Sequence, residues 1–258
     1  MDLSGTAAIV SGGASGLGEA VARELARAGS TVVIADLNAE RGEPIAAALG
    51  GEFVRTDVSD EGAVSAAVDV AASRQAPLRV VVNCAGIAWA ERTLSREGRP
   101  HSTDAFRKVI DINLLGTFHV TRLAAAAIAK TEPVDADGQR GVVINTSSVA
   151  GIEGQTGQLA YAASKGGIIG MTVPAARDLS VIGVRVNTIC PGIIDTPIYG
   201  ALTPASEEFK AKLSAPVVFP KRMGTAAEFA KLARSLIEND YMNAEVVRFD
   251  GGIRFQPK

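Results

Sequence analysis

The sequence predicts an α/β fold: a single doubly wound parallel sheet of seven strands with helices on both faces. Two observations lead to this prediction. Short apolar runs alternate with longer segments of helical periodicity along the chain, which is the pattern of repeated βαβ units. Several runs, such as residues 80–82 and 142–144, are apolar at every position, which is typical of strands buried on both faces of a parallel sheet.

The individual elements follow from this alternation. Strands are expected at residues 6–10, 31–36, 52–55, 80–83, 141–146, 184–189 and 245–249. Helices are expected at residues 16–28, 39–49, 61–74, 103–130, 158–179 and 226–238. Gly29 and Gly183 stand where helices should stop. No polar linker, repeat or low-complexity segment divides the 258 residues, so residues 1–258 are expected to form one domain.

Residues 191–220 depart from the alternation. They contain five of the eleven prolines and no clear strand, and they follow the sixth strand directly. Ligands of open α/β sheets lie beyond the carboxyl ends of the strands. A long excursion there is expected to be a substrate lid. The alternative is a surface insertion that aids oligomerisation.

The composition argues against several classes of partner. Hydrophobic residues make up 47% of the chain and charged residues 21%, as in well-packed globular proteins. A formal net charge of −2 provides no attraction to nucleic acid or an anionic membrane. The apolar run 123–129 is too short to span a bilayer, and the N-terminus shows no secretory signal. We therefore expect a cytoplasmic protein with no nucleic-acid and no membrane partner.

The cysteines and histidines do not suggest a metal site. Cys84 and Cys190 lie at apolar strand ends without metal-ligand spacing, and a reduced intracellular state suits them. His101 and His119 are too few to form a convincing site, and His119 lies in a helical pattern where a structural role is expected.

A glycine-rich turn follows the first strand. Gly12, Gly16 and Gly18 would let backbone N–H groups approach a pyrophosphate at the start of a helix. Asp36 ends the second strand, where a carboxylate can accept hydrogen bonds from an adenosine ribose and repel a 2′-phosphate. Leu37 follows, where a basic residue would have favoured NADP. The arrangement predicts an NAD site; the alternative for Asp36 is a turn-capping acid.

Polar or glycine-rich segments also follow the later strands. They comprise Asp57 with Val58, the run Asn83-Cys84-Ala85-Gly86, the run Thr146-Ser147-Ser148, and Pro191 with Gly192. The carboxyl ends of parallel strands share one edge, so these segments should line a single cleft. Asp57 could bond the adenine amino group with Val58 over the ring, or Asp57 could merely cap a turn.

The chemistry is expected from Tyr161 and Lys165. Helix positions four residues apart share a face, so the phenol and the ammonium should be neighbours. A nearby positive charge lowers the pKa of a phenol from about 10 toward neutrality. Tyr161 could then take a proton from an alcohol or return one to a ketone. Ser148, at the end of the fifth strand, could hold the same oxygen and stabilise developing charge.

Asn113 stands inside the predicted helix 103–130. Asparagine is unfavourable in a helix interior because its side chain competes for backbone partners. It could mark a local kink or a polar anchor beneath the site; the alternative is a solvent-facing side chain.

Together these motifs resemble the short-chain dehydrogenase/reductase family along nearly the whole chain. Residues 11–18 are similar to the family's T-G-x-x-x-G-x-G motif with serine first, and residues 83–86 to its N-N-A-G motif with cysteine second. The family's catalytic tetrad falls on Asn113, Ser148, Tyr161 and Lys165. In the family, the asparagine and lysine sustain a proton-relaying water chain, and the lysine also bonds the nicotinamide ribose.

The resemblance also implies contacts to the cofactor. Ser15 and Leu17 would lie at the pyrophosphate, Thr196 at the nicotinamide carboxamide and Ile194 against its ring. The residues expected to bind NAD are Gly12, Ser15, Gly16, Leu17, Gly18, Asp36, Asp57, Val58, Asn83, Cys84, Gly86, Tyr161, Lys165, Ile194 and Thr196.

Within the family, residues 154–167 and 249–254 resemble the type II 3-hydroxyacyl-CoA dehydrogenases of fatty acid metabolism. This implies a homotetramer that oxidises L-3-hydroxyacyl-CoA with NAD, with Ser148, Gln158 and Tyr161 at the substrate. The alternatives are a dehydrogenase of hydroxysteroids or other secondary alcohols, and a 3-oxoacyl-acyl-carrier-protein reductase, which Asp36 disfavours because such enzymes usually take NADPH. A non-catalytic NAD-sensing protein is the alternative from a different class.

Overall fold

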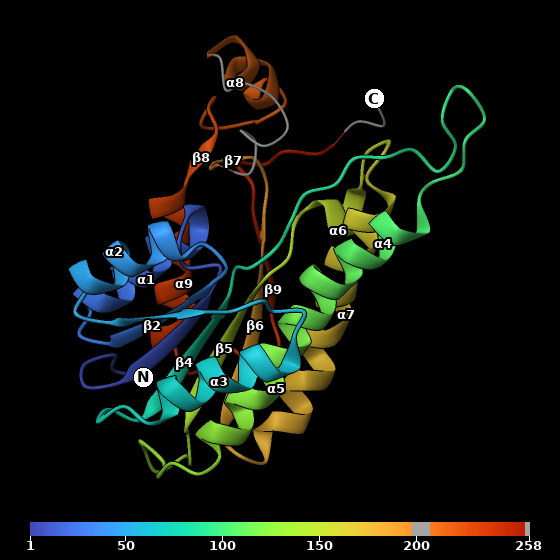
Figure 1. Cartoon of the computed structure of the whole chain (residues 1–258). Coiled ribbons are helices and arrows are strands. Elements are labelled where there is room, and N and C mark those ends of the chain that lie inside the picture. The colour runs from blue at the N-terminus through green and yellow to red at the C-terminus, as the bar shows by residue number, and fades with distance from the viewer. Residues whose placement is uncertain (198–206, 256–258) are drawn as a thin grey trace.

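A computed structural model describes residues 1–197 and 207–255 and contains a seven-stranded parallel sheet in the order β3-β2-β1-β4-β5-β6-β9 (Figure 1). The strands are β1 (Ala7–Ser11), β2 (Thr31–Asp36), β3 (Glu52–Arg55), β4 (Leu78–Asn83), β5 (Gly141–Thr146), β6 (Val184–Pro191) and β9 (Val246–Phe249). Each was predicted to within two residues. The predicted doubly wound α/β fold is therefore confirmed.

Helices cover both faces of the sheet (Figure 1). One face packs α1 (Gly16–Arg27), α2 (Ala39–Ala48) and α9 (Ala226–Glu238). The other packs α3 (Glu61–Ala72), α5 (Gly116–Ile128) and α7 (Leu159–Ser180), with α4 (Thr103–Ile110) beside α7. Two shorter helices are α6 (Ala150–Glu153) and α8 (Glu207–Ser214).

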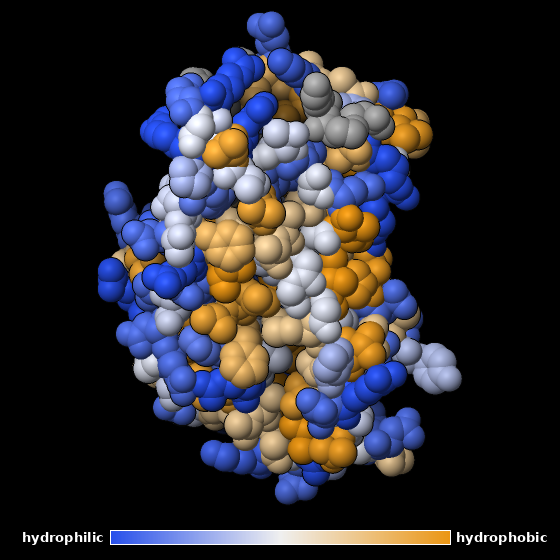
Figure 2. All heavy atoms as spheres, turned by 90° about the vertical axis from the view of Figure 1, so that its right-hand side faces the viewer, coloured by the Kyte–Doolittle hydropathy of each residue, from blue (hydrophilic) through white to orange (hydrophobic). Residues whose placement is uncertain are grey.

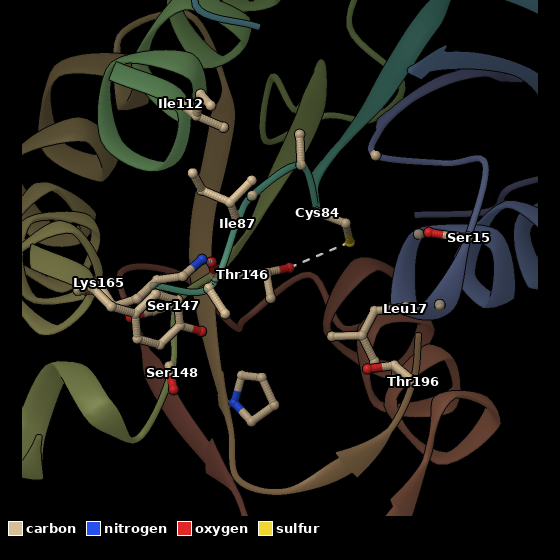
Figure 3. A pocket seen from close by; sticks show the side chains of 18 of the residues that line it. Ser15, Leu17, Cys84, Ile87, Ile112, Thr146, Ser147, Ser148, Lys165 and Thr196 are labelled. Atoms are coloured by element: carbon tan, nitrogen blue, oxygen red, sulfur yellow. Dashed lines mark hydrogen bonds between the residues drawn. The ribbon is translucent and has the colours of Figure 1, made fainter. Parts of the chain in front are cut away.

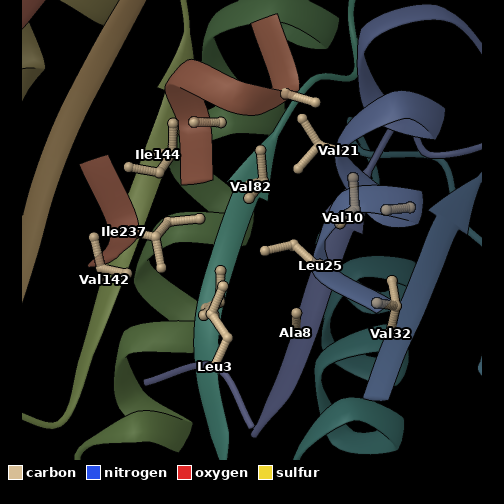
Figure 4. Close-up of a cluster of buried hydrophobic side chains, with 14 of the residues drawn as sticks. Leu3, Ala8, Val10, Val21, Leu25, Val32, Val82, Val142, Ile144 and Ile237 are labelled. Atoms are coloured by element: carbon tan, nitrogen blue, oxygen red, sulfur yellow. The ribbon is translucent and has the colours of Figure 1, made fainter. Parts of the chain in front are cut away.

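Neighbouring residues of one strand enter different cores. In β1, Ala8 and Val10 pack with Val21 and Leu25 of α1, as Figure 4 shows. Ile9 points to the opposite face and joins the core under α3, α5 and α7. Burial on both faces explains why runs inside the central strands, such as residues 80–82 and 142–144, are apolar at every position.

The predicted helix 103–130 is interrupted in its middle. Residues Asp111–Leu115 form a π-helical turn between α4 and α5, with Asn113 fully buried within it. The Thr117 hydroxyl donates to the Asn113 carbonyl at 2.7 Å, and such turns mark functional sites in many proteins. The predicted helix is confirmed from Thr103 to Ile128, with the predicted distortion at Asn113, and the solvent-facing alternative for Asn113 is excluded.

The segment after β6 contains more regular structure than the sequence predicts. β7 (Ile194–Asp195) pairs in parallel with β8 (Gly224–Thr225), and α8 lies between them. The expectation of no strand in residues 191–220 is therefore wrong for Ile194–Asp195. Residues 198–206 of the predicted lid lie outside the described residues.

The outer face of α5 and α7 carries a band of apolar side chains (Figure 2). Leu115 before α5, Phe118 on α5, and Leu159 and Val173 on α7 are each between 38% and 47% exposed. Within residues 1–197 and 207–255, no helix is long and apolar enough to cross a membrane. The same residues hold no cluster of three or more side chains suited to a metal ion.

Candidate active site

A cavity of about 630 Å³ runs along the carboxyl ends of the strands (Figure 3). Most residues that the sequence singled out line it, namely Gly12, Ser15, Gly16, Leu17, Gly18, Asp36, Asp57, Val58, Cys84, Gly86, Ser148, Gln158, Tyr161, Lys165, Ile194 and Thr196. Asn83 and Asn113 do not line the cavity, and both side chains are buried. The carboxyl edge of the sheet thus brings together residues from most of the length of the chain.

The glycine turn is packed too closely for side chains. Gly12 has φ +69°, a conformation that other residues rarely adopt. A Cβ atom on Gly18 would overlap the carbonyl oxygen of Gly12, and one on Gly12 would meet the backbone of Ala85. The turn therefore presents bare backbone to the cavity at the start of α1, which is the geometry that accommodates a pyrophosphate.

Asp36 caps a turn, as one of the two roles that the sequence left open requires. One carboxylate oxygen accepts a hydrogen bond from the Ala14 N–H and the other from the Asn38 N–H, both at 3.0 Å. The side chain therefore fixes the glycine turn and its own turn. It also lines the cavity, where each carboxylate oxygen retains capacity for another hydrogen bond.

Asp57 and Val58 are held in place from both sides. The carboxylate of Asp57 accepts hydrogen bonds from the Ser59 hydroxyl at 2.6 Å and the Ser59 N–H at 2.9 Å, and these bonds lower the pKa of Asp57. His119 Nδ1 lies 3.1 Å from the Val58 carbonyl oxygen. Asp57 is thus a turn cap in this structure, and His119 has the expected structural role.

Tyr161, Ser148 and Lys165 meet in the cavity wall below the end of β5. The Ser148 hydroxyl shares a hydrogen bond with the Tyr161 phenol. The Lys165 ammonium lies 5.7 Å from the centre of the Tyr161 ring. It also donates to the Thr146 carbonyl at 2.9 Å. The phenol and the hydroxyl can therefore address one substrate oxygen together, with a cation close by.

Burial dominates the ionisation of this group. Desolvation raises the pKa of Tyr161 above 10, and the hydrogen bond with Ser148 offsets only part of the rise. Desolvation also lowers the pKa of Lys165 from 10.5 to about 8. The expected lowering of the Tyr161 pKa is therefore wrong for the protein alone, because burial of the phenol itself disfavours its charged form.

The Asn113 side chain pins the loop that follows β4. Its Oδ1 accepts from the Ile87 N–H at 2.8 Å, and its Nδ2 donates to the Ile87 carbonyl at 3.0 Å. The second Nδ2 proton goes to the Ser164 hydroxyl, also at 3.0 Å. Protein partners occupy both amide protons, so the Asn113 side chain has no proton left to donate to a water or a substrate. The predicted polar anchor describes this geometry.

Asn83 and Cys84 make structural contacts. Asn83 Nδ2 donates to Thr121 Oγ1 at 3.1 Å and to Asn145 Oδ1 at 2.9 Å, which ties β4 to α5 and β5. The Cys84 thiol lies 3.4 Å from Thr146 Oγ1 (Figure 3). Burial raises the pKa of Cys84 to about 11, so the thiol remains protonated and unreactive near neutral pH.

The sequence did not single out several cavity residues. They are Thr56, Ile87, Ala88, Trp89, Ala90, Ile112 and Phe255, among others. Residues 87–90 directly follow the motif at residues 83–86 and show no helical or strand periodicity. This pattern could have indicated a loop that lines the cavity. Phe255 carried no signal, because only the fold brings the chain's end to the cavity.

Comparison with known proteins identifies the family. The model of the short chain dehydrogenases matches residues 6–207. The chain belongs to the short-chain dehydrogenase family. It shares 48% identity with the human and bovine 3-hydroxyacyl-CoA dehydrogenases type-2, covering 98% of this chain and 97% of each relative. The crystal structure of 3-hydroxyacyl-CoA dehydrogenase type-2 from Mycobacterium avium superposes with a TM-score of 0.93 at 50% identity, covering 98% of both chains.

Membership makes this short-chain dehydrogenase a nicotinamide-dinucleotide-dependent oxidoreductase. Its own residues fit such a cofactor at three places. The backbone at Gly12 and Gly18 leaves room that side chains would fill. Asp36, at the end of β2, lines the same cavity as Tyr161 and Lys165 of α7.

Proposed function

We propose that this short-chain dehydrogenase interconverts 3-hydroxyacyl-CoA and 3-oxoacyl-CoA with NAD as cofactor. The observation that carries the proposal is the joint placement of Tyr161, Ser148 and Lys165 in a cavity whose far end is lined by Asp36. Relatives at 45–48% identity over nearly the full length carry the name of this activity, which supports the choice of substrate.

The side chains divide the work by their charge and position. Tyr161 donates its phenolic proton to the substrate oxygen during reduction and accepts it back during oxidation. Ser148 holds that oxygen through its hydroxyl and stabilises the charge that develops there. Lys165 supplies the positive charge that favours the phenolate. The bound nicotinamide supplies the hydride, or accepts it.

NAD rather than NADP is the proposed cofactor. Asp36 lines the cavity with a carboxylate, which would repel a 2′-phosphate, and Leu37 beside it carries no compensating charge. Like charges at close range are costly in a partly buried site. The proposal therefore includes a preference for NADH over NADPH of at least about 100-fold, which corresponds to roughly 2.7 kcal/mol.

The proposal extends to the architecture of the enzyme. We infer a single-domain subunit in which residues 191–220 serve as the substrate lid, a homotetrameric assembly and a cytoplasmic location. The apolar band on α5 and α7 supports the assembly, because its half-exposed Leu115, Phe118, Leu159 and Val173 favour contact with another subunit. A proline-rich excursion directly beyond β6 supports the lid.

Reduction of acetoacetyl-CoA tests the proposal. We expect turnover with NADH, weak turnover with NADPH, and a loss of about 10³-fold in the Tyr161→Phe variant because the proton donor is gone. Tyr241→Phe is the matched control, since its phenol is 99% exposed and should leave the rate unchanged.

Three other results would point elsewhere. A wild-type rate no higher than that of Tyr161→Phe would refute the acyl-CoA substrate, and a panel of hydroxysteroids and other secondary alcohols would then identify the alternative. Equal use of NADPH would refute the cofactor assignment. Tight NAD binding without turnover of any alcohol would indicate a sensor.

A further inference from the structure

The connection between β4 and α4 forms an ordered arm beside the cavity. The arm comprises residues 87–102, which lie between β4 and α4 in the chain. Its tip is a loop that projects past α4 (Figure 1). Backbone hydrogen bonds from Ser95 to Arg99 at 2.9 Å and from His101 to Thr93 at 3.0 Å close its tip as a hairpin. Its base, Ile87 to Ala90, lines the cavity.

Trp89 is the one tryptophan of the chain, and it stands in this wall. Its indole N–H donates to Glu91 Oε2 at 3.0 Å. The only polar atom of the ring is therefore satisfied by the arm itself, and the remaining ring surface is available for apolar contact. Trp89 is still 37% exposed, so part of that surface has no protein neighbour.

Glu91 ties this tryptophan to the catalytic helix. Its Oε1 accepts from the Ser102 N–H at 2.8 Å, and its own N–H donates to the Gly157 carbonyl at 2.8 Å. The backbone of Glu91 also forms a parallel bridge with Gln158, just before α7. The hydrogen bonds from Ser102 and Trp89 lower the pKa of Glu91, so the carboxylate stays charged at neutral pH. The ring is thus fixed relative to the helix that carries Tyr161.

The chemistry of the wall decides what the ring can contact. Among the described residues that line the cavity, the charged ones are Asp36, Asp57 and Lys165. The two acids stand at the ends of β2 and β3, whereas Trp89 has Ile87, Ala88 and Ala90 on the same wall. A hydrocarbon suits such a wall, and the phosphates and amides of a CoA arm do not.

We propose that Trp89 determines specificity for chain length by packing against the hydrocarbon chain of the 3-oxoacyl substrate beyond its fourth carbon. Glu91 is the positioning residue that holds the indole. This inference rests on the proposed 3-oxoacyl-CoA activity and adds the segment of substrate that the arm recognises.

The test compares 3-oxodecanoyl-CoA with acetoacetyl-CoA, which share the CoA arm and differ in the acyl chain. Trp89→Ala should lower kcat/KM for the ten-carbon substrate by roughly 10- to 30-fold and for acetoacetyl-CoA by no more than about threefold. Trp89→Phe keeps an apolar ring and should retain most of the preference. Glu91→Gln should show an intermediate, chain-length-dependent loss. Leu94→Ala is the matched control, because Leu94 lies on the same arm, is 59% exposed and is not among the cavity-lining residues.

A second readout uses the intact wall. Since the chain has one tryptophan, its fluorescence reports on position 89 alone. In Tyr161→Phe protein saturated with NAD⁺, 3-oxodecanoyl-CoA should shift the emission to shorter wavelength, whereas acetoacetyl-CoA should not. This measurement does not depend on the folding of any Trp89 variant.

Three outcomes would overturn the inference. Equal losses for both substrates would place Trp89 against the CoA arm, and a gain with 3-oxodecanoyl-CoA would make it a plug that limits chain length. Identical emission spectra with both thioesters would show that the chain does not reach the ring. By contrast, a wild-type enzyme inactive on both thioesters would refute the proposed function itself, and the inference with it.

Discussion

The two ends of the cavity differ in what forms them: mainly backbone at one end and mainly side chains at the other. The cofactor end is made of backbone: the turn at Gly12 and Gly18, the Ala14 N–H held by Asp36, and strand ends whose side chains fill both cores. These atoms are already in contact with one another. A larger side chain there must displace the main chain, and the close packing around it leaves no space for that displacement.

The substrate end is assembled by side chains that tie remote segments together. Glu91 ties the arm to the residues before α7. Arg248 donates to Glu153 at 2.6 Å, to Asp250 at 2.7 Å and to the Ile253 carbonyl at 2.9 Å. These bonds hold the C-terminal residues beside α6, and with them the cavity residue Phe255. Such links can be exchanged one at a time, so this end of the cavity can change specificity while the cofactor end stays constant.

The largest effect should come from Gly18→Ala at the cofactor end. The added Cβ would overlap the Gly12 carbonyl, and a backbone neighbour cannot rotate away. We expect a loss of NADH affinity of at least about 100-fold, equivalent to roughly 2.7 kcal/mol, measured by fluorescence titration.

Gly170→Ala provides the matched control for this change. Gly170 lies in α7, is exposed, and has nothing within 4 Å of an added Cβ. This variant should bind NADH normally, since the added methyl group meets no atom of the cavity. Normal NADH affinity in Gly18→Ala would contradict the view that the cofactor end tolerates no added atom.

The same contrast explains what the sequence could predict. Gly12, Gly18 and Asp36 meet local requirements of φ, space and charge, so their spacing along the chain identifies the cofactor end. The packing of two cores makes residues 80–82 of β4 and 142–144 of β5 apolar at every position, which is why the strands were located to within two residues. Asn113 revealed itself because a helix interior disfavours asparagine.

The substrate end could not be predicted in this way. Glu91 meets Gly157, which is 66 positions away in the sequence, and Glu153 meets Phe255, which is 102 positions away. No periodicity marks such pairs. The raised pKa of Tyr161 was missed for a related reason. The neighbouring charge of Lys165 is visible in the sequence, whereas the burial that opposes it exists only in the folded protein.

Lys165, which lines the cavity together with Tyr161, should show how much burial of its charge lowers the stability of the protein. The fall of its pKa from 10.5 to about 8 corresponds to ~3 kcal/mol of lost stability at neutral pH. Lys165→Met removes the charge and the hydrogen bond to Thr146 together. We expect an inactive protein whose free energy of unfolding at pH 7 is higher by roughly 1–2 kcal/mol.

The pH dependence gives this prediction its sign. Below pH 8 both the folded and unfolded states carry the proton, so the wild type bears the full cost. Between pH 8 and 10.5 the unfolded state binds more protons, so the wild type gains stability as the pH rises. The advantage of Lys165→Met should therefore shrink over that interval in urea titrations. Lys231→Met, an exposed change on α9, should alter stability by less than ~0.5 kcal/mol at every pH.

The smallest effect should come from Arg248→Met at the substrate end. Losing this guanidinium removes the partner that Glu153 and Asp250 share. The Ile253 carbonyl loses one of its two donors and keeps Arg254. Each of these bonds is partly exposed, so we expect a loss of only ~1 kcal/mol in stability. Because Phe255 follows this network into the cavity, KM for 3-oxoacyl-CoA should rise by roughly three- to tenfold.

Arg248→Met should not affect cofactor binding. Measuring NADH affinity therefore decides whether the two ends of the cavity respond independently or together. NADH affinity of Arg248→Met should stay within about twofold of the wild type, as should that of Arg234→Met, whose partners Glu24 and Glu238 lie on α1 and α9. Parallel losses of NADH affinity and substrate affinity in Arg248→Met would mean that the cavity behaves as one unit. A loss of substrate affinity alone would mean that ion pairs adjust acyl recognition without affecting the backbone that binds the cofactor.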